Sequence, residues 1–274
     1  MHTRPRHQQG NLIWMFSGTG EGPILARSLL ALGWRVRVSV VSSVAALAYQ
    51  ESTGLEVTVG PIGGSRAVAE ALAAAEAAGD PPVWLIDATH PFARRISAEL
   101  ALACRLRGQP LLRLQRPLVP EGEAFVLSDL SALRKHSLVG RPLMLAIGAR
   151  QLAAAVACSP GAFHHARLLP NPGSLSLAMA AGLRAERVAC LRPTSQGLVE
   201  GALCRRWGIK AVLCRRSGGK TENLWHRLSA ELDLRLLLLE RPPDVEGVEC
   251  HGPESLLERL GRPGSQPTGW WKHA

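Results

Sequence analysis

Asp87, Thr89 and His90 are the residues most able to do chemistry, because an apolar run ends there at an acid, a hydroxyl and an imidazole. The run, Val83 to Ile86, is short and follows two prolines, which is typical of a buried parallel strand. Pro91 suits the first turn of a helix, where its missing N–H costs nothing. The three polar side chains are therefore expected at the carboxyl end of a strand, where open α/β sheets bind ligands. The structural alternative is that they only cap the helix and make ordinary hydrogen bonds.

A glycine-rich turn follows the first predicted strand, Leu12 to Phe16, and precedes a helix expected from about Pro23 to Leu32. Its candidate residues are Gly18, Thr19, Gly20 and Glu21. Such a turn lets backbone N–H groups approach a phosphate at the positive end of a helix. The full dinucleotide fingerprint spacing is missing, and tight turns also use glycine for geometry alone. Nucleotide binding and a plain turn therefore both stay open.

The second predicted strand, Arg35 to Val41, ends at Ser42 and Ser43. Enzymes that prefer the non-phosphorylated nicotinamide cofactor usually carry an acid at this point to bind the ribose hydroxyl. Here two serines stand instead, with Arg35 and Arg37 nearby, and these groups would accept a ribose phosphate. The pattern predicts NADPH as the cofactor, with NADH as the alternative.

Strand and helix patterns alternate along the chain, which predicts an α/β fold of two Rossmann-like domains with mainly parallel sheets and an interdomain cleft. The expected segments are a disordered leader at 1–9, an N-terminal Rossmann-like domain at 10–120, a connector at 121–140, a C-terminal α/β domain at 141–262 and a flexible tail at 263–274. Each predicted strand is followed by a polar or glycine-bearing turn, so ligand-binding residues are expected in both halves.

Composition narrows the function classes. The formal charge of +10 over 274 residues would suit nucleic acid, an anionic cofactor or a polycarboxylate. No long basic run or aromatic-basic motif is present, so nucleic-acid binding is not expected. The six cysteines form no Cys-x-x-Cys pair, so no metal site is expected. No apolar run approaches the roughly 20 residues that cross a bilayer, and none has signal-peptide length, so we expect a cytoplasmic protein without membrane partners.

The stretch Asp-Ala-Thr-His-Pro-Phe-Ala at residues 87–93 resembles the signature of the precorrin-6A reductase family of cobalamin biosynthesis. The first glycine turn resembles that family's Gly-Gly-Thr-x-Glu-Ala, with Ser17 replacing the first Gly and Gly22 standing where Ala is usual. Two turns of the second half depart from the family. Its Gly-Pro-Phe-Ser appears as residues 192–195, and its Thr-Lys-Asp-Ser-Gly appears as residues 214–218, where Asp is replaced by an arginine.

The resemblance implies hydride transfer from a reduced nicotinamide cofactor to one ring double bond of precorrin-6A or cobalt-precorrin-6A, a corrin precursor with many carboxylates. It implies catalytic or orienting roles for Asp87, Thr89 and His90. It implies cofactor binding by Gly18, Thr19, Gly20, Glu21, Ser42 and Ser43. It implies substrate or cofactor binding by Gly148, Arg150, Ser195, Arg215, Ser217 and Gly218. The alternatives are a nicotinamide-dependent reductase of another substrate and a non-catalytic tetrapyrrole- or nucleotide-binding protein.

Overall fold

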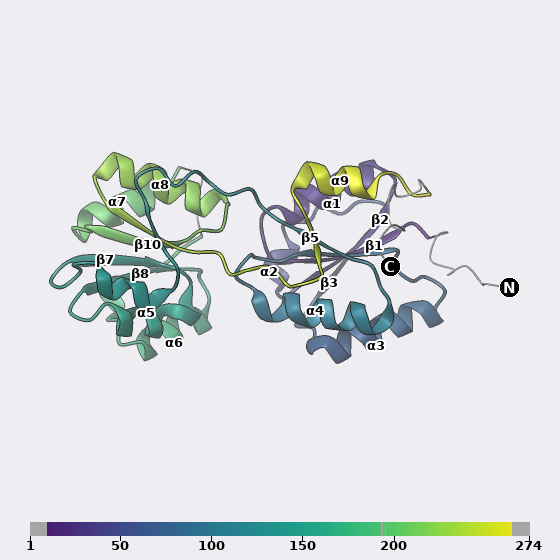
Figure 1. Cartoon of the computed structure of the whole chain (residues 1–274), viewed down its shortest axis with the longest axis horizontal. Helices are drawn as coiled ribbons and strands as arrows, with labels where there is room; N and C mark the ends of the chain where they lie inside the picture. Colours follow the sequence, from purple (N-terminus) through teal and green to yellow (C-terminus); the bar gives the residue numbers. More distant parts are fainter. Residues whose placement is uncertain (1–9, 193, 195, 265–274) are drawn as a thin grey trace. The chain divides into compact units, whose positions relative to one another are not determined.

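The chain forms two compact units in the computed structural model, which describes residues 10–264 except 193 and 195 (Figure 1). One unit comprises Met1–Arg116 with Pro242–Ala274, and the other comprises Pro117–Arg241. The predicted leader at 1–9 and all of the predicted tail from residue 265 onward lie outside the described residues.

The first unit is built on a six-stranded parallel sheet with the order β12-β5-β4-β1-β2-β3. Its strands are β1 (Leu12–Ser17), β2 (Arg35–Val40), β3 (Leu55–Val59), β4 (Trp84–Ala88), β5 (Leu111–Leu114) and β12 (Glu249–His251). Its helices are α1 (Gly22–Ala31), α2 (Ser43–Ala46), α3 (Gly64–Ala77), α4 (Arg94–Arg107) and α9 (Pro253–Leu260).

Apolar cores cover both faces of this sheet. Strand alternation sends Ile13 and Met15 of β1 into the core beneath α1 and α9, and sends Trp14 and Phe16 into the core beneath α3 and α4. Figure 1 shows these helix pairs on opposite sides of the sheet. Because every residue of β1 is buried, its polar continuation can begin only at the strand's carboxyl end.

The second unit repeats this plan with a parallel sheet of order β6-β11-β10-β7-β8-β9. Its strands are β6 (Phe125–Leu127), β7 (Pro142–Ala146), β8 (Phe163–Leu168), β9 (Val188–Cys190), β10 (Ala211–Arg215) and β11 (Arg235–Leu239). Its helices are η2 (Leu130–Lys135), η3 (Ala149–Gln151), α5 (Leu152–Cys158), α6 (Pro172–Ala180), η4 (Ala185–Arg187), α7 (Leu198–Arg206) and α8 (Lys220–Leu232). The predicted α/β class with Rossmann-like parallel sheets is confirmed, while the interdomain cleft stays a prediction.

Two predicted boundaries are wrong, and both errors concern a sixth strand at a sheet edge. Residues 121–140 are not a separate connector, because β6 pairs with β11 and belongs to the second sheet. Residues 242–262 do not belong to the second unit, because β12 pairs with β5. Leu256 and Leu260 of α9, 0% and 4% exposed, also fill the core of the first unit. The first unit is therefore completed by the last described segment of the chain.

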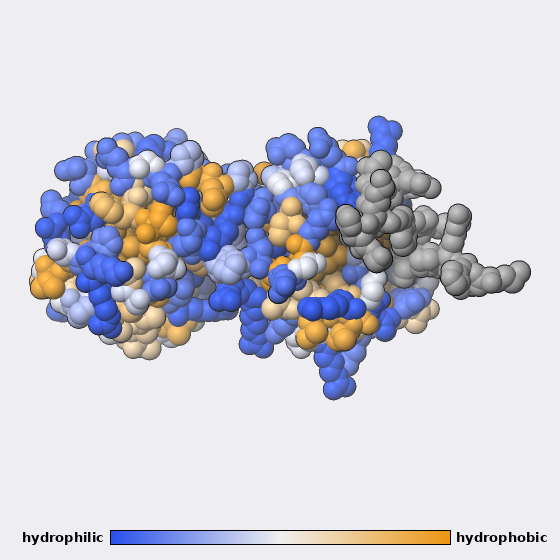
Figure 2. All heavy atoms as spheres, in the orientation of Figure 1, coloured by the Kyte–Doolittle hydropathy of each residue, from blue (hydrophilic) through white to orange (hydrophobic). Residues whose placement is uncertain are grey.

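The surface mixes polar and apolar residues. On the face drawn in Figure 2, hydrophilic residues surround smaller apolar patches. In the part of the chain that the structure describes, no helix has the length and apolar character needed to cross a bilayer. The cytoplasmic location expected from the sequence stays a prediction.

Candidate functional site

The strand order of each unit reverses beside its first long strand. In the first unit the reversal falls between β1 and β4, where Ser17 lies opposite Ala88. The glycine turn after β1 and the Asp87–His90 turn after β4 therefore emerge side by side at the carboxyl edge. Ligands of doubly wound sheets bind at such a switch point, because the two crossover connections leave in opposite directions there. The structure thus brings together two segments that lie about 70 residues apart in the sequence.

The glycine turn leads directly into α1. The Gly22 N–H donates to the Thr19 carbonyl oxygen at 3.3 Å, and Pro23 occupies the first turn of the helix. At Gly18 and Gly20, an added Cβ would meet no described atom within 4 Å, and neither residue has a positive φ. The described fold therefore does not require glycine at these two exposed positions, in contrast to turns where φ is positive.

The Glu21 carboxylate is engaged in an ion pair within the first unit. Its Oε2 accepts a hydrogen bond from Nη2 of Arg116 at 2.7 Å, and the Arg116 side chain is 10% exposed. Arg116 follows β5, so this ion pair ties the glycine turn to a second strand end. Glu21 is accordingly a residue that shapes the turn.

Asp87 lies at the centre of a buried polar network. The residue is 1% exposed, and its Oδ2 forms an ion pair with Nη1 of Arg113 on β5, itself 4% exposed. Asp87 Oδ1 accepts from the Thr89 N–H at 3.0 Å and from the Thr89 hydroxyl at 2.6 Å. Arg113 Nη1 also donates to Ser97 Oγ at 2.6 Å. Both carboxylate oxygens are engaged, so Asp87 holds the shape of the turn.

Arg113 stays cationic in this interior position. Burial by itself would lower the pKa of its guanidinium, but attraction to Asp87 and the hydrogen bond to Asp244 outweigh burial and raise the pKa. An ion pair of this kind is costly to break, since removal of one partner leaves a buried charge.

His90 is presented by a short turn before α4. Its backbone carbonyl accepts from the Ala93 N–H at 2.7 Å, and its ring Nδ1 accepts from the Phe92 N–H at 3.1 Å. The helix begins at Arg94, later than the predicted Pro91, because residues 90–93 form this turn first. An Nδ1 that accepts a hydrogen bond places the proton of a neutral imidazole on Nε2.

Ser42 and Ser43 follow the carboxyl end of β2, and both are exposed. The Ser42 hydroxyl accepts from the Ala45 N–H at 3.2 Å and caps α2. The idea that Arg35 and Arg37 lie near these serines is wrong. Arg35 pairs with the start of β1, and the six residues of β2 place it about 17 Å from the strand's last residue, Val40, with Ser42 beyond that end.

The two arginines are also committed elsewhere. Arg35 donates to Asp80 at 2.7 Å, and Arg37 donates to Glu56 at 2.8 Å. The guanidinium of Arg37 further lies 5.7 Å from the ring centre of Trp14. These contacts belong to the middle and amino end of the sheet, so they lend no support to a phosphate site after β2.

A second cluster forms at the switch point of the other unit, between β7 and β10. Arg215, the last residue of β10, donates from Nε and Nη2 to the side-chain oxygen of Gln151 at 3.1 and 2.8 Å. Gly148 has φ +81°, and a Cβ there would lie 3.4 Å from the Arg215 guanidinium. Glycine at this position therefore allows the positive φ and leaves room for the guanidinium of Arg215.

The Arg215 side chain is partly buried. Burial lowers its pKa, and the neighbouring positive charge of Arg150 also lowers it. Two arginines close together, one oriented by a neutral amide, form a region of positive potential that would attract a carboxylate.

The turn after β10 is stabilised by a hydrogen bond to Glu222, which lies in the first turn of α8. The Gly218 N–H donates to Glu222 Oε2 at 2.6 Å, and Gly218 has φ +69°. Glu222 is 0% exposed and Ser217 is 4% exposed, so Ser217 lies inside the turn. Ser195, also predicted to bind ligand, lies outside the described residues.

The charge reversal at Arg216 is balanced within the unit. Arg216 forms ion pairs of 2.7 Å with both Glu121 and Glu240, and its side chain is 13% exposed. The arginine that departs from the family pattern is therefore a structural cation. This removes the main reason to expect an altered ligand at the turn.

Sequence reasoning missed four residues that support these turns: Gln151, Glu222, Asp244 and the role of Arg113. Arg113 carried a signal, since a lone arginine between leucines in a buried strand requires a buried partner. The other three lie in loops or helix starts, where polar residues are ordinary. Nothing in the local sequence pattern marked Glu222 or Asp244.

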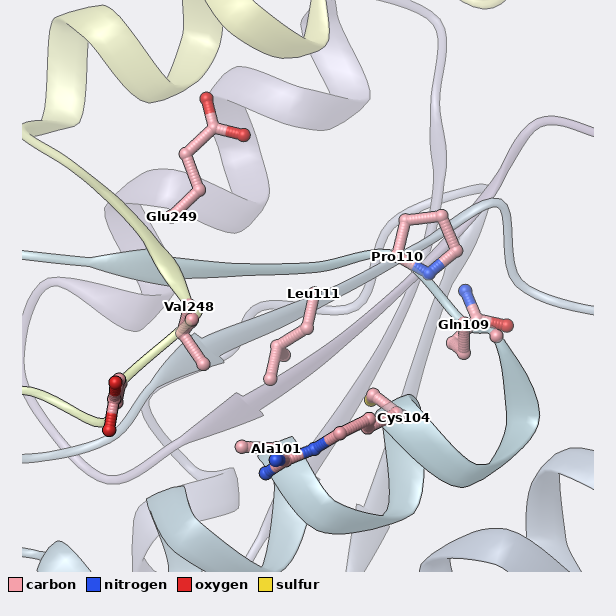
Figure 3. Close-up of a pocket in the computed structure, with 11 residues that line it drawn as sticks. Ala101, Cys104, Gln109, Pro110, Leu111, Val248 and Glu249 are labelled. Atoms are coloured by element: carbon pink, nitrogen blue, oxygen red, sulfur yellow. The ribbon is translucent and has the colours of Figure 1, made fainter. Parts of the chain in front are cut away.

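A pocket of about 380 Å³ lies at the opposite edge of the first sheet (Figure 3). It is lined by the end of α4 and by the amino-terminal starts of β5 and β12, including Cys104, Leu111 and Glu249. Burial raises the pKa of the Cys104 thiol to about 12, which disfavours the thiolate form. The pocket is separate from the switch-point turns. Among the described residues, no group of three or more His, Cys, Asp and Glu could hold a metal ion.

Two Rossmann-like units with polar turns at their switch points define a doubly wound α/β protein. The sequence model of the precorrin-6x reductase CbiJ/CobK family matches residues 12–260, and the chain belongs to that family. A solved structure of the CobK precorrin-6A reductase superposes with a TM-score of 0.73, covering 95% of this chain and 100% of that one at 24% identity. That likeness supports the fold.

Curated relatives agree with the family. The cobalt-precorrin-6A reductase of Synechocystis is 29% identical over 241 residues, covering 86% of this chain and 90% of that protein. The precorrin-6A reductase of Mycobacterium tuberculosis is 28% identical over 238 residues, covering 86% and 91%. The relatives thus include reductases named for the metal-free substrate and for the cobalt-containing one.

Proposed function

We propose that this protein reduces one ring double bond of precorrin-6A, or of its cobalt form, in cobalamin biosynthesis, with a reduced nicotinamide cofactor as hydride donor. Family membership and the names of the relatives support the reaction class. The observation that carries the cofactor site is the turn after β1. Gly18 and Gly20 are exposed at the switch point, although the described fold does not need glycine at either position. Close approach of a ligand to the backbone explains both glycines.

The cofactor would lie across the carboxyl edge of the first sheet. The turn from Gly18 to Gly20 and the start of α1 would bind its pyrophosphate, and Ser42 with Ser43 would lie near its ribose. The absence of an acid after β2 favours NADPH over NADH. Arg35 and Arg37 do not add to this argument, because they pair with Asp80 and Glu56. The bound cofactor would supply the hydride, and the protein would supply binding and orientation.

Asp87, Thr89 and His90 would act beside the reacting ring, with different roles. Asp87 and Thr89 fix the turn through their mutual hydrogen bonds. His90 is the candidate to orient the substrate or to donate the proton that accompanies hydride addition, because its neutral ring would carry the proton on Nε2.

Arg215 and Arg150 would bind a carboxylate of the substrate. Gln151 orients the Arg215 fork, and such a fork suits bidentate contact with a carboxylate. A macrocycle with many carboxylates would use this contact for positioning. A reductase of another carboxylate-bearing substrate remains the second candidate, since the turn at residues 192–195 differs from the family pattern.

The test is anaerobic single-turnover absorbance at the reduced-nicotinamide band, with metal-free or cobalt-containing precorrin-6A. We expect loss of the band only with macrocycle present, faster with NADPH than with NADH. Gly18→Ala and Gly20→Ala should weaken cofactor binding about tenfold, because a methyl group would occupy the ligand's approach. Gly252→Ala is the matched control, since it also adds a methyl group in open space, but at the start of α9.

The controls decide between the alternatives. Gly252→Ala should leave cofactor affinity unchanged, and all three variants should retain their unfolding midpoints. A band that persists with both macrocycles while cofactor or macrocycle still binds would favour the non-catalytic binding protein. Unchanged affinity in both turn variants would place the cofactor away from this turn.

A further inference from the structure

The segment that returns the chain from the second unit to the first carries a carboxylate with two partners, one on β5 and one just after it. Asp244 Oδ1 accepts from Nε of Arg113 at 2.7 Å, and Asp244 Oδ2 accepts from Nε2 of Gln115 at 2.6 Å. Arg113 and Gln115 are two residues apart, so they point to the same face of the sheet. Asp244 therefore bridges a strand and its continuation from 129 to 131 residues away.

The Arg113 fork connects this bridge to the turn after β4. Its Nε is held by Asp244, and its Nη1 reaches Asp87 and Ser97. A guanidinium is planar, so a bond that fixes Nε also fixes the direction in which Nη1 points. The position of Asp244 therefore sets the position from which Arg113 holds the Asp87 carboxylate.

Asp87 in turn holds the backbone that presents His90. One carboxylate oxygen accepts both the N–H and the hydroxyl of Thr89, the residue immediately before His90. Rotation of the carboxylate would thus be passed to the turn within two residues. The chain of contacts runs from Asp244 through Arg113 and Asp87 to Thr89, which is bonded to His90 along the backbone.

We propose that Asp244 is a positioning residue for the Asp87–Thr89–His90 turn, acting through Arg113. The inference rests on the proposed function, since it assigns a role in the proposed active site to a residue that touches no reacting atom.

Asp244→Asn is the sharpest perturbation. The asparagine keeps the size of the side chain but has an NH2 group in place of one carboxylate oxygen. In the same side-chain position, either Arg113 or Gln115 would therefore face a donor instead of an acceptor. A displacement of about 1 Å at a positioned group can cost up to about 100-fold in rate, so we expect kcat to fall about tenfold or more. The cofactor turn is not part of this network, so the KM for the cofactor should stay within about twofold.

Asp80→Asn is the matched control. It removes the same charge from an exposed ion pair of the same unit, where Asp80 binds Arg35 at the amino end of the sheet. Each measured rate is divided by the concentration of protein that binds cofactor. A variant that contains less folded protein then does not appear slower for that reason alone. Unchanged kcat in Asp80→Asn, with a tenfold fall in Asp244→Asn, is the expected result.

A second readout does not depend on turnover. The His90 ring resonances, assigned with a His90→Gln variant, should shift in Asp244→Asn and stay in place in Asp80→Asn. An Asp244→Asn protein with wild-type kcat and unmoved His90 resonances would overturn the inference. If Asp244→Asn keeps wild-type kcat and His90 resonances while Asp87→Asn and His90→Ala lose activity, the positioning role of Asp244 is refuted and the proposed site is not. If those two variants also keep full activity, the proposed site fails with it.

Discussion

Gly22 and Ser17 form a tightly packed pair at the start of α1, and Gly22→Ala is the perturbation that tests it. A Cβ on Gly22 would lie 1.9 Å from Ser17 Oγ, 2.4 Å from the Tyr49 hydroxyl oxygen and 3.0 Å from Ser17 Cβ. The first two separations are far below normal contact distances. Ser17 is 5% exposed, so its side chain has little room to move.

The magnitude follows from overpacking. Extra methyl groups in a packed interior cost about 1–3 kcal/mol. Alanine favours a helix over glycine by up to about 1 kcal/mol, so the net loss in Gly22→Ala should be about 1–2 kcal/mol. Ser17→Gly alone should cost about 0.5–1 kcal/mol, because glycine weakens a strand.

The double variant should recover much of the loss. Ser17→Gly removes both Ser17 contacts and leaves only the Tyr49 hydroxyl, which is the end of a flexible side chain. The pair then carries glycine and alanine at the two positions, as in the family pattern that the turn resembles. We expect a favourable coupling of at least about 1 kcal/mol between the two changes.

Urea unfolding of the wild type, the two single variants and the double variant measures this coupling. Gly20→Ala is the control in the same turn, since its added methyl group would meet no described atom within 4 Å. It should stay within about 0.5 kcal/mol of the wild type. The reasoning is refuted if Gly22→Ala is equally stable, or if the double variant is no more stable than Gly22→Ala.

Three other predictions follow from buried charges. Asp87→Ala should cost about 3 kcal/mol in urea unfolding, because it removes one partner of a buried ion pair; a loss below about 1 kcal/mol would contradict the pairing. Arg215→Lys should raise the KM for the polycarboxylate about tenfold and leave that for the cofactor unchanged, because lysine keeps the charge and loses the fork; equal changes in both would refute a substrate role. Burial lowers the pKa of His164 and His165 below the ordinary 6.5. Below pH 6.5 the unfolded chain therefore binds protons that the folded unit does not, so the free energy of unfolding should decrease as the pH is lowered through this window. The decrease should be less steep in His165→Gln. An identical slope in that variant would contradict the assignment.

The sequence by itself predicted the parts of the fold that depend on local pattern. Short apolar runs ending in polar turns marked the strands, because a buried parallel strand can change character only where it leaves the sheet. The same rule placed Asp87 and Gly18 at strand ends. Their meeting at one switch point then follows from β1 and β4 being neighbours.

Other features depended on direction within a strand. Arg35 is close to Ser42 in sequence, yet it lies at the amino-terminal end of the six-residue strand β2, whereas Ser42 lies beyond its carboxyl end. Local sequence distance therefore misplaced the two arginines, while NADPH as the cofactor stays a prediction. The tertiary structure shows Arg35 paired with Asp80 instead.

Only the tertiary structure decided to which unit the last described segment belongs and which contacts stabilise the site. β12 has three residues, too few for a periodic signal, and its place is determined by the open edge of β5. Asp244 and Arg113 are 131 residues apart, and neither residue type predicts the other as its partner. A buried charge must find a counter-charge wherever the chain supplies one, and that choice is made by packing.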